Sequence, residues 1–215
     1  MDIVYIATVL GVILVSMMLH ELMHGFIALK LGDDTARLLG RLSFNPLKHV
    51  DPVMTIMIPL LIVVTNALTG ATTPVFGGAK PVPFNPANIK SEWGVALIAI
   101  AGPMVNLVIA FIAYGIFVYS GVLVDTVLGT ILQAVVWVNL GFFAFNILPI
   151  PPLDGSRVLY ALAPDFVRNI MEMIERYGVF LVFALVLLFN NLLFTYMSAM
   201  IGWVLTGFNY VLGII

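Results

Sequence analysis

The chain has 215 residues, of which 62% are apolar and 9% are charged, and its formal net charge is −2. A soluble domain carries about 25% charged residues, so this composition excludes an ordinary soluble protein and indicates a membrane protein. No basic tract suggests a nucleic-acid partner, and the absence of cysteine excludes disulfides, cysteine-ligated zinc and a thiol nucleophile.

Six apolar stretches are long enough to lie in a membrane, where a helix needs about 20 apolar residues to cross about 30 Å of hydrocarbon. In chain order they are 3–29, 53–69, 93–119, 127–148, 177–192 and 196–215. No basic region precedes the first stretch and no cleavage site follows it, so we expect a retained transmembrane helix and not a signal peptide. The last two share one apolar tract, in which Asn190, Asn191 and Thr195 indicate where the chain turns.

These stretches predict an all-α integral membrane protein with five to six transmembrane or re-entrant helical segments, in a single domain over residues 1–215. Short cytoplasmic strands and loops would connect them. Segment 36–48 is broken by Gly40 and Pro46, and we expect one or two short strands there. Segment 77–86 is rich in proline and should be an extended loop.

The nine Lys and Arg residues fall in three segments, 30–48, 80–90 and 157–176. If the stretch 53–69 crossed the membrane, the second group would lie opposite the first. If it enters and returns, all nine cations lie on one side, as the positive-inside rule favours. Pro59 near its middle suits a re-entrant segment. We therefore expect the helix over 3–29 to run toward the cytosol, the next long helix away from it, and the following one back again.

A metal-binding pattern lies inside the first predicted helix. His20 and His24 are four residues apart, so both imidazoles lie on one helix face and can reach a single zinc ion. Glu21 can address a metal-bound water without binding the metal itself. Ionisable residues in a membrane helix are costly and usually functional. His49, in a basic loop, is expected to be a surface histidine without a catalytic role.

A catalytic zinc usually takes three protein ligands, so a third is needed at the same depth. Asp154 is the candidate, because it follows Pro149, Pro151 and Pro152 at the inner end of the helix over 127–148. That helix also carries Asn139 and Asn146, seven residues apart and therefore on one face.

The two metal motifs resemble those of the site-2 proteases, which are intramembrane zinc metalloproteases: His20-Glu21-x-x-His24, and Asn146-x-x-Pro149-x-Pro151-x-Leu153-Asp154-Gly155. The run Gly102-Pro103-Met104-Val105-Asn106 resembles their pattern as well, and the loops 45–52 and 79–86 resemble those of the short bacterial and archaeal branch.

The resemblance implies one Zn²⁺ on His20, His24 and Asp154, with Glu21 as the catalytic acid/base. It implies cleavage of a transmembrane helix of a single-pass membrane protein, near the cytosolic face of the plasma membrane, within membrane lipid and without nucleic acid. It would also make Asn146 a residue that positions the substrate backbone.

Segment 36–48 or the 79–86 loop could hold an unwound substrate by β-addition. Two other readings of the same ligands remain: a metal-ion transporter, in which Glu21 has no necessary role, and a metal-binding membrane module without activity.

Overall fold

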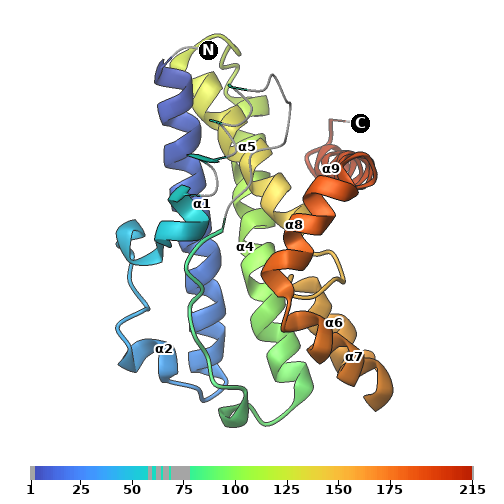
Figure 1. Ribbon diagram of the computed structural model, residues 1–215. Helices are drawn as coiled ribbons and strands as arrows, with labels where there is room; N and C mark the ends of the chain where they lie inside the picture. Colours follow the sequence, from blue (N-terminus) through green and yellow to red (C-terminus); the bar gives the residue numbers. More distant parts are fainter. Residues whose placement is uncertain (1–2, 58–59, 62–63, 65–67, 69–77, 215) are drawn as a thin grey trace.

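The computed structural model describes residues 3–57, 60, 61, 64, 68 and 78–214 (Figure 1). Its elements, in chain order, are α1 (Ile3–Lys30), α2 (Thr35–Leu38), η1 (Pro46–His49), η2 (Pro52–Met57), η3 (Pro86–Asn88), α4 (Glu92–Tyr119), α5 (Val127–Asn146), α6 (Gly155–Leu162), α7 (Asp165–Glu175), α8 (Gly178–Leu188) and α9 (Asn190–Val211). No strand occurs in the described part of the chain. The predicted all-α class is therefore confirmed.

Four described helices are long and apolar enough to cross a membrane: α1, α4, α5 and α9. α8 has 11 residues, which gives a length of about 16 Å, so it does not span the hydrocarbon alone. The chain turns at Phe189 between α8 and α9, next to the predicted turn at Asn190. The Tyr114 hydroxyl of α4 donates to Asn209 Oδ1 of α9 at 2.7 Å and joins α9 to the other helices.

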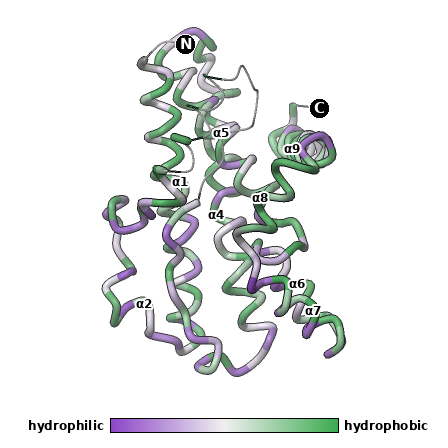
Figure 2. The backbone as a smooth tube through the Cα atoms, in the orientation of Figure 1, coloured by the Kyte–Doolittle hydropathy of each residue, from purple (hydrophilic) through white to green (hydrophobic). Residues whose placement is uncertain are grey.

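α1, α4 and α5 form the centre of the molecule, with α4 antiparallel to the other two (Figure 1). Leu22, Ile98 and Leu140, one from each helix, are fully buried. The buried face of α4 is rich in small residues, which allow close approach where lipid provides no hydrophobic driving force between helices. Many large apolar side chains of these helices are exposed. In Figure 2 the long helices are coloured mostly as hydrophobic.

The strands expected within 36–48 are wrong. This part of the chain contains the short helix α2 and the 3-10 turn η1 instead. Asp33 Oδ1 accepts from the Thr35 N–H at 3.3 Å, and Asn45 Oδ1 accepts from the Leu47 N–H at 3.0 Å. Such local side-chain bonds give the backbone an alternative to strand pairing. His49 is also not a surface histidine: it is 3% exposed.

Much of the predicted re-entrant stretch 53–69 lies outside the described residues, but the segments on either side of it meet. The Lys80 N–H donates to the His49 carbonyl at 2.8 Å, and the Thr55 hydroxyl donates to the Gly78 carbonyl. A single crossing would separate its two ends by about 30 Å. Residues 78 and 80 thus lie beside residues 55 and 49, as the expected topology requires.

Candidate metal centre

Three side chains from distant parts of the sequence meet inside the helix bundle. His20 and His24 lie one turn apart on α1, with ring centroids 4.7 Å apart, and both are buried. Asp154 reaches them from the segment between α5 and α6. Its Oδ2 lies 3.1 Å from His20 Nε2 and 3.5 Å from His24 Nε2. One ligand atom from each residue lies within 4.8 Å of the other two.

The turn after α5 presents Asp154 to the histidines. Within it, the Leu153 N–H donates to the Ile150 carbonyl at 2.9 Å. Gly155 then starts α6 against the end of α5, where an added Cβ would lie 2.2 Å from the Ile147 carbonyl oxygen. A glycine is therefore required directly after the aspartate, because any side chain would push this turn away from α5.

The arrangement fits a bound metal ion. His24 Nδ1 donates to the Ile98 carbonyl at 2.7 Å, and His20 Nδ1 lies 2.6 Å from Asn106 Oδ1, which leaves both Nε2 atoms for a metal. α4 keeps the space beside them open: a Cβ on Gly102 would lie 2.5 Å from His24 Nε2 and 2.6 Å from His20 Nε2. Two imidazole nitrogens and a carboxylate are a set that zinc accepts.

A chain of buried polar groups continues from His20 into the bundle. Asn106 Nδ2 donates to Asn139 Oδ1 at 2.7 Å, and Asn139 Nδ2 donates to Ser16 Oγ at 2.9 Å and to the Val135 carbonyl at 2.8 Å. Both asparagines are fully buried. The sequence did not predict these contacts, although polar residues in three apolar helices were a usable signal.

Residues 80–85, called the strap below, form an extended segment that runs beside α1 (Figure 1). Arg41 Nη2 donates to the Lys80 carbonyl at 2.9 Å. At the other end, the Asn85 N–H donates to Asp33 Oδ2 at 2.8 Å. The strap is therefore fastened at both ends to the region that follows α1.

Asp33 is fully buried in the loop after α1. Burial alone would raise the pKa of this carboxyl, but hydrogen bonds from Thr35, Asn85 and Asn88 outweigh it and hold the pKa below its usual range. Asp33 thus stays ionised and holds the strap through charge-assisted hydrogen bonds.

The middle of the strap contacts Glu21, the predicted catalytic residue. The Val82 N–H donates to Glu21 Oε2 at 2.8 Å, and Val82 is 5% exposed. A backbone donor therefore orients one carboxylate oxygen beside the candidate ligands. The sequence could not predict this contact, because every residue except proline offers the same N–H group.

The strap has few main-chain donors for β-addition of a substrate. Lys80 and Val82 donate their N–H groups within the protein, to the His49 carbonyl and to Glu21. Pro81 and Pro83 have no N–H group. Four consecutive residues therefore have no free N–H to offer to a substrate carbonyl.

Asn146, the predicted substrate-binding residue, lies at the end of α5 and is half-buried. Its Nδ2 donates to the Phe142 carbonyl of the same helix at 3.0 Å. A role toward substrate stays a prediction.

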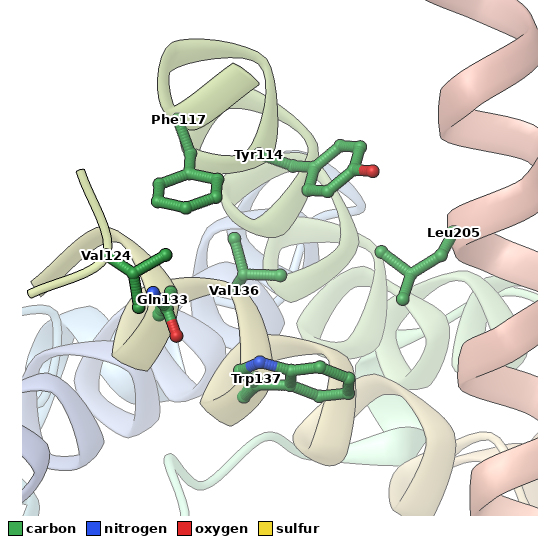
Figure 3. A pocket seen from close by; sticks show the side chains of 7 residues that line it. All are labelled: Tyr114, Phe117, Val124, Gln133, Val136, Trp137 and Leu205. Carbon is green, nitrogen blue, oxygen red and sulfur yellow. The ribbon is translucent and has the colours of Figure 1, made fainter. Parts of the chain in front are cut away.

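An apolar cavity of about 240 Å³ lies between α4, α5 and α9 (Figure 3). Its lining offers no carboxylate and no imidazole, and it includes none of the candidate ligands. The residues are Tyr114, Phe117, Val124, Gln133, Val136, Trp137 and Leu205. This cavity is therefore separate from the candidate metal centre.

Comparison with known proteins also points to a metal-dependent protein. The family described as peptidase family M50 matches residues 8–127 and 118–189. YwhC of Bacillus subtilis, whose curated name places it provisionally among zinc metalloproteases, is 40% identical over 181 residues, which are 80% of this chain and 75% of that protein.

Proteins named Rip2, with the same provisional description, match 68% of this chain and 53% of their own length. They are 33% identical in Mycolicibacterium smegmatis and 31% identical in Mycobacterium tuberculosis. The chain thus spans about half the length of these mycobacterial relatives. No solved structure matches it. The family match covers most of the chain, and the chain accordingly belongs to peptidase family M50, the site-2 protease family of zinc metalloproteases.

Proposed function

We propose that this chain is an intramembrane zinc endopeptidase that hydrolyses a peptide bond in a transmembrane helix of a single-pass membrane protein. In this proposal residues 1–215 act as one domain that holds one zinc ion on His20, His24 and Asp154. The observation that carries it is the meeting of these three donors within 4.8 Å of one another, on helices long and apolar enough to cross a membrane.

When bound there, zinc polarises a carbonyl and lowers the pKa of water toward neutrality. Glu21 accepts the proton of the attacking water and delivers it to the leaving amine. The Val82 N–H holds Oε2, and no described hydrogen bond reaches Oε1. We therefore propose that Glu21 exchanges the proton through this second oxygen.

His20 lies in the half of α1 nearer to Lys30, which supports cleavage toward the side on which α1 ends. His20 lies ten residues before the end of α1 at Lys30, a distance of about 15 Å along the helix axis. The segments that carry the nine Lys and Arg residues follow this end of α1, precede α4 or follow α5. Positive charge marks the cytosolic side, so we propose that water reaches the site from the cytosol. The plasma membrane is the proposed location.

A substrate helix must unwind before attack, because its carbonyls are held in intrahelical hydrogen bonds. The unwound backbone then needs partners in lipid, where an unsatisfied polar group is costly. Since the strap offers no free N–H between 80 and 83, Asn146 is the proposed partner for a substrate backbone group. Its present bond, to Phe142 O at 3.0 Å, lies within its own helix and can be exchanged.

The test uses purified protein in liposomes with a single-pass substrate that carries Gly or Pro near its cytosolic end. We expect one zinc per chain and zinc-dependent cleavage. Glu21→Gln should retain zinc and lose turnover, because an amide cannot accept the proton. Asn146→Ala should retain zinc and cleave more slowly.

The same liposomes, loaded with a zinc-sensitive dye, separate the rival readings. Undiminished cleavage by Glu21→Gln would sink the assignment of Glu21. Zinc flux without any cleavage would favour a transporter, and zinc binding with neither flux nor cleavage would favour a binding module.

A further inference from the structure

The hydrogen bonds that link His20 to two buried asparagines all run in one donor-to-acceptor direction. In the molecule they run from His20 on α1 through Asn106 on α4 to Asn139 on α5. An asparagine side chain has one accepting end and one donating end, which look alike in shape. All donors and acceptors in this network could therefore be exchanged, unless one of its groups can only donate or only accept.

The Val135 carbonyl is such a group. A carbonyl oxygen accepts and never donates, so the atom of Asn139 that lies 2.8 Å from it must be Nδ2. Oδ1 of Asn139 must then face Asn106, which can meet it only with Nδ2. Ser16 also contacts Asn139 Nδ2, but a hydroxyl can donate or accept and does not set a direction.

Asn106 connects this donor–acceptor order to the metal site. With its Nδ2 turned to α5, Asn106 presents Oδ1 to His20 Nδ1 at 2.6 Å. Nδ1 must then carry the proton, and Nε2, which lies 3.1 Å from Asp154 Oδ2, keeps a free lone pair. If Asn106 flipped, Nδ1 would have to accept, the proton would move to Nε2, and His20 could not bind a metal there.

The tautomer of His24 is also set by a main-chain carbonyl, here through a direct hydrogen bond. Its Nδ1 contacts the Ile98 carbonyl directly at 2.7 Å, and this carbonyl again can only accept. Both histidine ligands are thus linked to a main-chain carbonyl, His24 directly and His20 through the side chains of Asn106 and Asn139.

We propose that Asn139 is a positioning residue that sets the tautomer of His20: anchored on the Val135 carbonyl, it orients Asn106 so that His20 Nε2 is free to bind the metal. This inference rests on the proposed zinc role of His20. It assigns a function in metal binding to a residue of α5 whose described hydrogen bonds go to Asn106, Ser16 and the Val135 carbonyl.

The decisive comparison is between two substitutions of similar size. Asn139→Leu fills the space but cannot accept from Asn106. Asn139→Asp retains an acceptor for Asn106, and burial favours its neutral form, which can still donate to the Val135 carbonyl. Ser16→Ala is the matched control, since it removes a contact of Asn139 Nδ2 and leaves the anchor in place.

The first readout is the zinc dissociation constant in detergent, measured by competition with a chromophoric chelator. We expect Asn139→Leu to weaken zinc binding about 10- to 100-fold, the usual effect of losing an outer partner of a metal ligand. Asn139→Asp and Ser16→Ala should bind close to the parent. The second readout is NMR of zinc-loaded protein with ¹⁵N-labelled histidine, in which the three histidines give a small set of ring signals. The parent should show the His20 proton on Nδ1.

A proton on His20 Nε2 in the parent would overturn the inference without any variant. So would parental zinc binding in Asn139→Leu, or equal losses in the Leu and Asp variants, which would indicate packing alone. A parent that binds no zinc would sink the proposed metal site together with this inference, whereas a zinc-binding parent with a tight Leu variant would sink the inference only.

Discussion

Replacing Val82 by proline tests how Glu21 is held. Its N–H donates to Glu21 Oε2 at 2.8 Å, and proline removes that donor. The backbone should accept the change, because a residue before proline is already restricted to extended conformations and Val82 precedes Pro83. Extended backbone of the polyproline type has the φ that proline requires.

The magnitude follows from the kind of bond that is lost. A hydrogen bond to a charged group contributes about 1.5–3 kcal/mol. If that free energy goes into orienting Glu21 during proton transfer, kcat should fall about 10- to 150-fold. KM and zinc content should stay near the parental values, because the strap contacts none of the three candidate ligands among its described hydrogen bonds.

The assay is cleavage of a reconstituted substrate with kcat and KM determined separately, together with metal analysis of each preparation. Val82→Ala is the matched control. It keeps the N–H and loses packing of a side chain that is 5% exposed, so it should lower thermal stability and leave kcat much closer to the parent. A proline variant with parental kcat, or an alanine variant as slow as the proline one, would refute this account of Glu21.

Gly102→Ala should weaken zinc binding about tenfold or more, because its Cβ would lie within 2.6 Å of both histidine Nε2 atoms; metal analysis checks this. Asp33→Asn should lower the melting temperature at neutral pH. Because the pKa of Asp33 is lowered in the folded protein, its stabilisation is present above the ordinary value of 3.8 and is lost as pH falls below it, so the melting temperatures of parent and variant should converge in acid. Single cysteines introduced at positions 48 and 80 should be labelled from one side of the membrane, and a cysteine at position 125 from the other side. If the cysteine at position 80 is labelled from the same side as the one at position 125, the stretch 53–69 is a full crossing and the expected topology is wrong.

The candidate ligands could be predicted from two constraints, the periodicity of the helix and the rarity of ionisable residues in a membrane. The spacing of His20 and His24 places them on one face of any helix. Depth then restricted the third ligand to a polar residue at the inner end of a later helix, where Asp154 lies. A membrane environment makes such predictions sharper, since polar residues are rare there and seldom accidental.

What the sequence did not predict has a different physical origin. The segment 36–48 contains α2 and η1 instead of the expected strands. Asp33 and Asn45 accept hydrogen bonds from main-chain N–H groups two residues further on, which favours such local structure over strand pairing. The partner of Glu21 is a main-chain N–H 61 residues away, and a main-chain group leaves no mark on the sequence. Asn139 was visible, but which helix it faced depends on how α1, α4 and α5 pack.

In the proposed mechanism, metal binding and proton transfer depend on different parts of the molecule. The metal side depends on side chains buried among α1, α4 and α5, such as Asn106 and Asn139, which are both fully buried. The proton-transfer side depends on a loop fastened by Asp33 and Arg41 outside the bundle. A packed core holds one arrangement, whereas a loop segment opens at much lower free energy. Zinc binding and turnover should therefore be separable by mutation, with core substitutions weakening zinc and strap substitutions slowing catalysis on a fully loaded site.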